Sequence, residues 1–171
     1  MSGPGENPPN ASPGTGGTVI FYDQYDFGTD ILAVDFYFLD LLGGMTAAHI
    51  HAPTGSPFAG TAGIATVEIR STDGDHAAGY HTLLDLQVPK VYDPAFLAAN
   101  GGTTTAAEAA LINALKDGMA YMDIHSSAFP DGEIRGFLAA VPDATTTGSL
   151  LGLALLGLSD LIQMRGRITA G

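Results

Sequence analysis

Residues 30–41 read DILAVDFYFLDL, and this stretch decides the fold class. Its side chains alternate between two faces with a period of two, which is the period of a β-strand. One face carries four large apolar side chains: Leu32, Val34, Phe36 and Phe38. The opposite face is more apolar than a solvated surface requires, and carries Ala33, Asp35, Tyr37 and Leu39. One face of the strand is therefore predicted to pack on the core, and the other face is predicted to be covered, for example by a subunit contact.

The same alternation recurs in six further stretches, with Gly and Pro turns between them. These predicted strands span residues 17–23, 45–53, 62–70, 80–88, 118–126 and 132–141. Two short helices are expected at residues 94–100 and 105–116, the second with Thr105 as its N-cap and Glu108 three positions later. Seven short strands with a single helical insertion predict an all-β, antiparallel sandwich.

The chain is expected to have three parts, because its composition changes twice. Residues 1–16 are rich in Gly, Pro and Asn and predict an extended arm without a core of its own. Residues 17–141 hold the predicted sandwich, and residues 142–171 hold a predicted apolar helix that Asp160 interrupts. This helix could pack in a protein core, anchor in a membrane or join subunits, and the pattern leaves these alternatives open.

The charge balance and the missing residue types exclude several classes of function. The 171 residues include six Lys and Arg against 18 Asp and Glu, which gives a formal net charge of −12. Such a surface repels phosphate and argues against nucleic-acid binding. The chain has no Cys, so disulfides and thiolate metal sites are excluded. It has no phosphate loop, dinucleotide fingerprint or nucleophile–base arrangement, and we expect no enzyme.

Three histidines and an aspartate are the candidate metal ligands. His49 and His51 are two residues apart in one predicted strand, so both imidazoles face the same side. Asp123 and His125 share a face of another predicted strand, and Asp123 could be a fourth ligand or could accept a hydrogen bond from a ligand. Such a set can bind Cu(II) or Zn(II), and we expect the three histidines to meet at one end of the sandwich. The alternative is that these histidines only form hydrogen bonds with loop backbone.

Two further groups of titratable residues are predicted to serve structure. His76 and His81 lie near an acidic turn that contains Gly, and both are expected in solvent. Glu133 and Arg135 are two residues apart in the last predicted strand, so they share a face of it. We expect them to form an ion pair beside the histidine motif.

Three stretches resemble the CHRD domain family, which is named for its occurrence in chordin. They are ENPPNASPGTG at residues 6–16, TAAHIHAP at residues 46–53 and YMDIHSSAFPDGEIRGFL at residues 121–138. The resemblance implies a Greek-key sandwich related to Cu/Zn superoxide dismutase and to immunoglobulin-like domains. It implies no firmly established activity.

The tail is similar to a second known element. VPDATTTGSLLGLALLGL at residues 141–158, with Arg165 and Arg167 beyond it, resembles a PEP-CTERM sorting segment. Together the two resemblances imply a bacterial protein of the cell surface or the extracellular matrix. No leader with a charged and an apolar region precedes the arm, so we expect export by a leader that is absent from this chain.

Two functions from different classes follow from these features. The first is a structural subunit that binds copies of itself, forming an extracellular filament or matrix through its arm, its apolar strand faces and its tail helix. The second is an exported copper- or zinc-binding protein that uses the three histidines. A membrane-anchored surface protein is a further alternative, in which only the C-terminal segment would touch the membrane.

Overall fold

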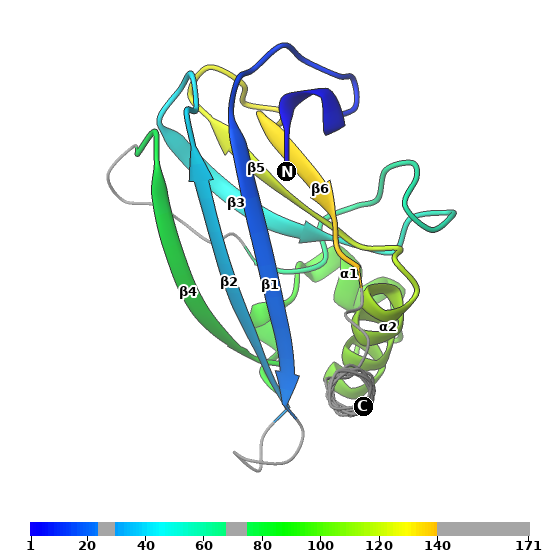
Figure 1. Cartoon of the computed structure of the whole chain (residues 1–171). Coiled ribbons are helices and arrows are strands. Elements are labelled where there is room, and N and C mark those ends of the chain that lie inside the picture. The colour runs from blue at the N-terminus through cyan, green and yellow to red at the C-terminus, as the bar shows by residue number, and fades with distance from the viewer. Residues whose placement is uncertain (24–29, 68–74, 140–171) are drawn as a thin grey trace, which may run out of the picture. The chain divides into compact units, whose positions relative to one another are not determined.

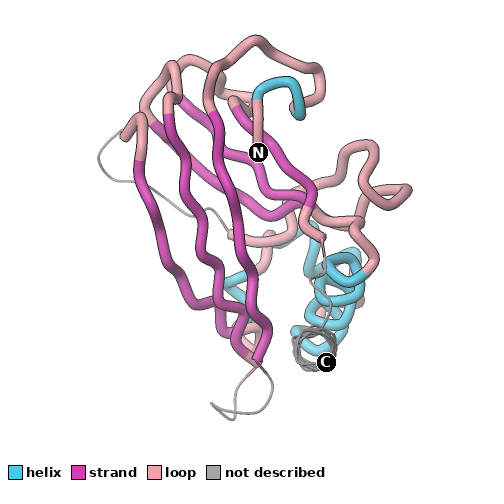
Figure 2. Tube along the Cα trace, viewed as in Figure 1, coloured by secondary structure: helices cyan, strands magenta, loops and turns pink. Residues whose placement is uncertain are grey.

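The computed structural model describes residues 1–23, 30–67 and 75–139 of the chain. The described strands form two antiparallel sheets of three strands each (Figures 1 and 2). The first sheet has the order β1 (Thr15–Asp23), β2 (Ile31–Leu39) and β4 (Ala78–Asp85). The second has the order β3 (Met45–His51), β5 (Tyr121–Ser126) and β6 (Ile134–Phe137). The prediction of a mostly-β, antiparallel protein is therefore confirmed.

The alternation that predicted β2 also explains how the first sheet packs. Leu32, Val34 and Phe38 are fully buried, whereas Tyr37 and Leu39 on the opposite face are about half exposed. β1 pairs with β2 along its whole length, and β4 pairs with the other edge of β2. The sheet therefore turns one apolar face to the core and the other face to solvent.

The second sheet contributes the other half of the core. Its side chains alternate in the same way, and those that point inward are Ala48, Ile50, Met122, Ile124 and Ile134. They belong to one apolar cluster with the buried side chains of β2. Burial of each large apolar side chain contributes about 1.5–3 kcal/mol, so this shared core is the main source of stability.

Two α-helices between β4 and β5 add buried side chains to the same core. The first, α1 (Pro94–Ala99), begins after Asp93, whose carboxylate accepts two backbone N–H bonds. The second, α2 (Thr104–Lys116), begins after Thr103, whose hydroxyl accepts one. The predicted N-cap Thr105 is wrong, because it lies inside α2. Thr103 has the extended backbone that lets a side chain reach the first free amides.

Several predicted strands are shorter in the structure, since β3 ends at His51 and β6 spans only Ile134–Phe137. Residues 62–67 pair with other segments only through isolated bridges: Ile64 to His51 and Thr66 to Tyr92. β4 ends at Asp85, and a 3₁₀ turn, η2 (Pro89–Val91), follows it. Alternation in the sequence cannot reveal this, because a strand also needs a neighbour along its length.

The two ends of the chain differ in what the structure describes. The N-terminal segment begins with a 3₁₀ turn, η1 (Gly3–Gly5), and Ser2 exchanges two backbone hydrogen bonds with Arg135. The predicted tail helix and the rest of residues 142–171 lie outside the described residues. Among the helices that are described, none has the length and apolar character needed to cross a membrane.

Candidate metal centre

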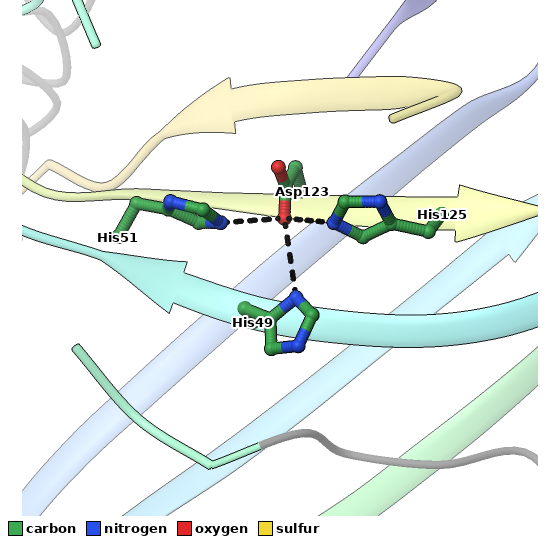
Figure 3. Close-up of side chains that lie close together, drawn as sticks. All are labelled: His49, His51, Asp123 and His125. Atoms are coloured by element: carbon green, nitrogen blue, oxygen red, sulfur yellow. Dashed lines mark ion pairs between the residues drawn. The ribbon is translucent and has the colours of Figure 1, made fainter. Parts of the chain in front are cut away.

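The four candidate metal ligands lie together on one face of the second sheet (Figure 3). His49 and His51 come from β3, and Asp123 and His125 come from the neighbouring strand β5. The antiparallel register places His49 directly opposite Asp123, and the period of two puts His125 on the same face. One nitrogen or oxygen of each residue lies within 4.8 Å of those of the other three.

The sequence predicts that the histidines meet at one end of the sandwich. In the structure they lie instead on the outer face of the second sheet. The residues next to the ligands in sequence, Ala48, Ile50, Met122 and Ile124, point into the core and are fully buried. Because successive side chains of a strand alternate, the four ligands point away from that core. They are nevertheless only 6% to 16% exposed, since other segments cover them.

Asp123 lies at the centre of the cluster. Its Oδ1 is 3.1 Å from Nε2 of His51, 3.3 Å from Nε2 of His125 and 4.0 Å from Nδ1 of His49. Ligand atoms bonded to a tetrahedral ion at about 2.0–2.1 Å are about 3.3 Å from one another. Two of the three distances are therefore close to those of a four-coordinate site, and the distance to His49 is longer.

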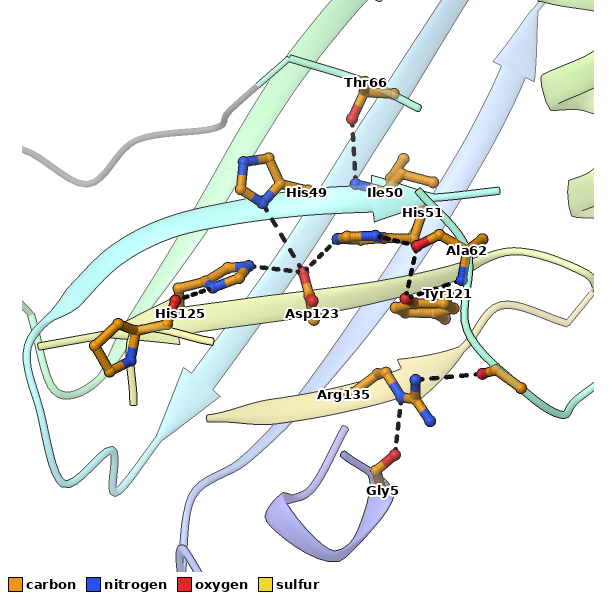
Figure 4. Close-up of polar contacts among 12 residues, drawn as sticks. Gly5, His49, Ile50, His51, Ala62, Thr66, Tyr121, Asp123, His125 and Arg135 are labelled. Atoms are coloured by element: carbon orange, nitrogen blue, oxygen red, sulfur yellow. Dashed lines mark hydrogen bonds and ion pairs between the residues drawn. The ribbon is translucent and has the colours of Figure 1, made fainter. Parts of the chain in front are cut away.

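Backbone carbonyls fix the orientation of two of the rings (Figure 4). Nδ1 of His51 is 3.0 Å from the oxygen of Ala62, and Nδ1 of His125 is 2.8 Å from the oxygen of Pro130. A carbonyl oxygen can only accept, so each Nδ1 carries the hydrogen and donates it. In the neutral ring Nε2 then holds the lone pair, which faces Asp123. Histidines that bind metals are oriented by outer hydrogen bonds of this kind.

The atoms that meet at the centre are all acceptors when the histidines are neutral. Among the described residues, Nε2 of His51, Nε2 of His125 and Oδ1 of Asp123 are buried and have no hydrogen-bond partner. Their contacts fall within ion-pair distance but lack the geometry of hydrogen bonds. Buried acceptors that face one another are unfavourable, so the cluster requires a cation, either a proton or a metal ion.

In the metal-free cluster the required cation is a proton on one of the histidines. The carboxylate of Asp123 raises the pKa of His125 to about 9, although burial opposes this shift. Burial raises the pKa of Asp123, but the contacts with His125 and His51 lower it more, to about 2. At neutral pH the metal-free cluster therefore holds an imidazolium beside a carboxylate, and a metal ion must displace the proton.

Tyr121 and Arg135 support the cluster, and sequence reasoning missed both roles. The ring of Tyr121 stacks on His51 with 4.8 Å between the ring centres, and the guanidinium of Arg135 lies 4.5 Å from the centre of the Tyr121 ring. Arg135 also donates to the backbone oxygens of Gly5 and Gly60 (Figure 4). Both side chains lie on the same face as the ligands, so the period of two could have identified them.

The predicted ion pair between Glu133 and Arg135 is wrong. Glu133 is fully buried, and its carboxylate accepts hydrogen bonds from Oγ of Ser12 at 2.5 Å and from the amide of Leu42 at 2.6 Å. Burial raises the pKa of Glu133, but these hydrogen bonds and one from Ser126 lower it more. Glu133 precedes the first residue of β6, so strand alternation does not place it on the face of Arg135.

The two remaining histidines lie apart from the cluster. His81 of β4 pairs with Asp35 of β2 at 2.7 Å, and its side chain is 59% exposed. His76 is also exposed, and its Nδ1 lies 2.7 Å from the backbone oxygen of Leu41. The prediction that both lie in solvent is confirmed.

One protein family model matches almost all of the described residues. The family model of the CHRD domain matches residues 1–138. No curated protein and no solved structure matches the chain. The matched range includes the four clustered side chains and the N-terminal segment that lies beside them.

Proposed function

The chain belongs to the CHRD domain family, and we propose that its domain binds one Cu(II) or Zn(II) ion through His49, His51, Asp123 and His125. Three imidazole nitrogens and one carboxylate oxygen form a ligand set that suits both ions. The four residues come from two paired strands of one sheet. A site on such a rigid element keeps its geometry better than one built on loops.

One observation carries this proposal: two ring nitrogens meet one buried carboxylate oxygen, and in each ring the other nitrogen donates to a backbone carbonyl. Histidines that only bonded loop backbone would turn their second nitrogen to solvent or to a donor. Instead, Nε2 of His51 and Nε2 of His125 both face Oδ1 of Asp123, while carbonyl oxygens hold the opposite side of each ring. A divalent ion at this point would accept the lone pairs of all three atoms.

We propose that the ion is bound for stability rather than for catalysis. Four protein ligands complete the shell of a tetrahedral ion, whereas catalytic zinc sites have three protein ligands and an open position. The ion would also join β3 to β5 and strengthen the contacts that His51 and His125 make with the covering loops. Metal binding is therefore expected to raise the free energy of unfolding.

Titration of the purified, chelator-treated chain with Zn(II) and with Cu(II) tests the proposal. We expect one ion per chain, and no binding at this site in the double variant His51→Ala/His125→Ala. His81→Ala is the matched control, because His81 also pairs with a cross-strand aspartate but lies in solvent. The proposal is contradicted if the unmodified chain binds neither ion, or if the double variant binds as well as the unmodified chain.

A second proposal concerns assembly, and the open face of the first sheet favours it. Four large apolar side chains on β1, β2 and β4 are between 48% and 59% exposed: Val19, Tyr37, Leu39 and Leu83. Apolar patches of this kind on a sheet often mark protein interaction sites. We propose that copies of the chain pack through this face, as subunits of an extracellular filament or matrix.

The location and the role of the tail are proposed from the resemblances of the sequence. The CHRD and PEP-CTERM-like motifs support a protein exported to the bacterial surface, with a Greek-key sandwich related to Cu/Zn superoxide dismutase. Residues 142–171 would then join copies, or alternatively anchor the chain in a membrane. The net charge of −12 supports the absence of nucleic-acid partners.

Light scattering of purified protein tests the assembly proposal. Deletion of residues 143–171 should leave a folded, soluble monomer, and the double variant Tyr37→Ser/Leu83→Ser should weaken association of the full chain. Assembly that persists after the deletion would contradict the proposed role of the tail. Assembly unaffected by the double variant would exclude the open face as the contact.

A further inference from the structure

Glu6 is a buried carboxylate that the proposed metal ligands do not include. It follows η1 in the N-terminal segment, and it is 7% exposed. Its carboxylate lies against the turn before β6, where a Cβ on Gly132 would be 3.0 Å from Oε1 of Glu6. Within the described part of the chain, this Oε1 has no hydrogen-bond partner. A buried, ionised oxygen without a partner is costly unless positive charge lies nearby.

The charges that act on Glu6 belong largely to the metal cluster. Burial and the negative charge of Asp123 raise the pKa of Glu6, Arg135 and His125 lower it, and the result is a pKa of about 7. Glu6 in turn helps to raise the pKa of His125. Arg135 directs its Nε and Nη1 at backbone oxygens. The turn that Glu6 contacts also holds a ligand, because the backbone oxygen of Pro130 accepts from Nδ1 of His125 at 2.8 Å. Arg135, which binds the backbone of Gly5, lies directly opposite Asp123 in the sheet. The geometry therefore places Glu6 near two of the four ligands.

Contacts on both sides of Glu6 hold it in this position. The backbone oxygen of Gly5, directly before it, accepts a hydrogen bond of 2.8 Å from Nε of Arg135. Asn10, four residues later, donates to the backbone oxygens of Gly132 at 3.3 Å and of Glu133 at 3.0 Å. These contacts fix the segment that carries Glu6 against β6 and the turn before it.

We infer that Glu6 is the outer charge partner of the divalent ion, an inference that rests on the metal site proposed above. A divalent ion brings two positive charges to the cluster, and Asp123 offsets one of them. The carboxylate of Glu6 offsets the second from outside the coordinating atoms, and the ion in turn stabilises the buried carboxylate. Metal binding and docking of residues 1–14 therefore stabilise each other, because coupling between two sites is reciprocal.

The zinc affinity of the full chain and of its Glu6→Gln variant tests this inference, with a chromophoric chelator as competitor. Gln has the shape of Glu without its charge, and we expect it to weaken zinc binding about tenfold, as one charge acts at this range in a partly buried site. Glu6→Asp keeps the charge and should bind zinc more tightly than Glu6→Gln. Asn10→Ala is the control, because it loosens the same segment without changing its charge.

Amide hydrogen exchange of the N-terminal segment gives a second measurement. Zinc should slow exchange at residues 2–16 in the unmodified chain, and much less in Glu6→Gln. Asn10→Ala keeps the charge and should lose less affinity than Glu6→Gln. The inference is overturned if Glu6→Gln binds zinc as tightly as the unmodified chain, or if Glu6→Asp loses as much affinity as Glu6→Gln. Both results leave the metal site intact. If the unmodified chain binds no zinc, the proposed function itself fails and this inference fails with it.

Discussion

The outer faces of the two sheets carry the same residue types in different surroundings. On the first sheet, His81 lies 2.7 Å from Asp35 on the adjacent strand, and their side chains are 59% and 47% exposed. On the second sheet, His51 lies 3.1 Å from Asp123 on the adjacent strand, and the exposed fractions are 10% and 6%. The His–Asp distances of the two pairs are similar, but only the second pair is buried.

This difference shows that solvent exposure decides whether a His–Asp pair on a strand face is a surface ion pair or a candidate metal site. Water screens the exposed pair, so it contributes only about 0–1 kcal/mol. The buried pair is shielded from water, so solvent cannot satisfy lone pairs that face one another. One strand pattern therefore yields a surface ion pair on the first sheet and a candidate metal centre on the second.

The largest expected difference between the two faces is in stabilisation by metal. At a zinc concentration about 1,000 times the dissociation constant, binding adds about 4 kcal/mol to the free energy of unfolding. For a chain of this size that raises the Tm by roughly 10 °C. Calorimetric scans with and without chelator should show this shift in the unmodified chain and in His81→Ala. A shift that remains in His51→Ala/His125→Ala would mean that the stabilising ion binds elsewhere.

The next largest difference is the cost of removing each aspartate from the metal-free protein. At pH 6, Asp123→Ala should lower the free energy of unfolding by about 2–3 kcal/mol, because it removes charged contacts from a buried site. Asp35→Ala should lower it by at most about 1 kcal/mol, because its pair is exposed. Urea denaturation followed by circular dichroism measures both values. Equal costs would show that burial does not distinguish the two pairs.

The pH dependence of zinc binding sharpens the comparison further. The pKa of His125 is raised from 6.5 to about 9, so its proton stabilises the metal-free fold fully below about pH 6.5. This stabilisation is lost as the pH rises through about 9. Because zinc must displace the proton, its affinity should rise by up to about tenfold per pH unit over this window. Titrations at several pH values measure the slope, and a flat profile would remove His125 from the ligand set.

The smallest effect is expected on the open face of the first sheet. Leu83 is 59% exposed, so Leu83→Ser should change the free energy of unfolding of the monomer by no more than about 0.5 kcal/mol. Urea denaturation at low protein concentration measures this value. A cost of several kcal/mol would show that this face is covered within a single chain.

Much of the strand pattern could be predicted, because alternation depends on neighbouring residues. The stretch 30–41 was predicted as a strand, and β2 spans Ile31–Leu39 within it. The stretch 62–70 alternates too, but residues 62–67 form only isolated β-bridges and no continuous ladder. Whether an alternating segment gains a partner along its length depends on tertiary structure, which its own sequence does not contain.

The ligand set could be predicted in part for the same reason. The spacing of His49 and His51 fixes a shared face, but their position on the outer side of the sheet depends on the packing of Ile50 between them. The role of Glu6 could not be predicted, because only the folded chain brings it near Asp123. Contacts between such distant parts of the sequence leave no local pattern.

Long-range proton–nitrogen NMR spectra of the histidine side chains test the central claim most directly, because they report on each ring nitrogen separately. When one equivalent of Zn(II) is added to the full chain, Nδ1 of His49 and Nε2 of His51 and His125 should shift together. The resonances of His81 should stay unchanged in the same titration. If the three rings of the second sheet keep their metal-free shifts, or if His81 responds in their place, the buried face holds no metal centre and the account is contradicted.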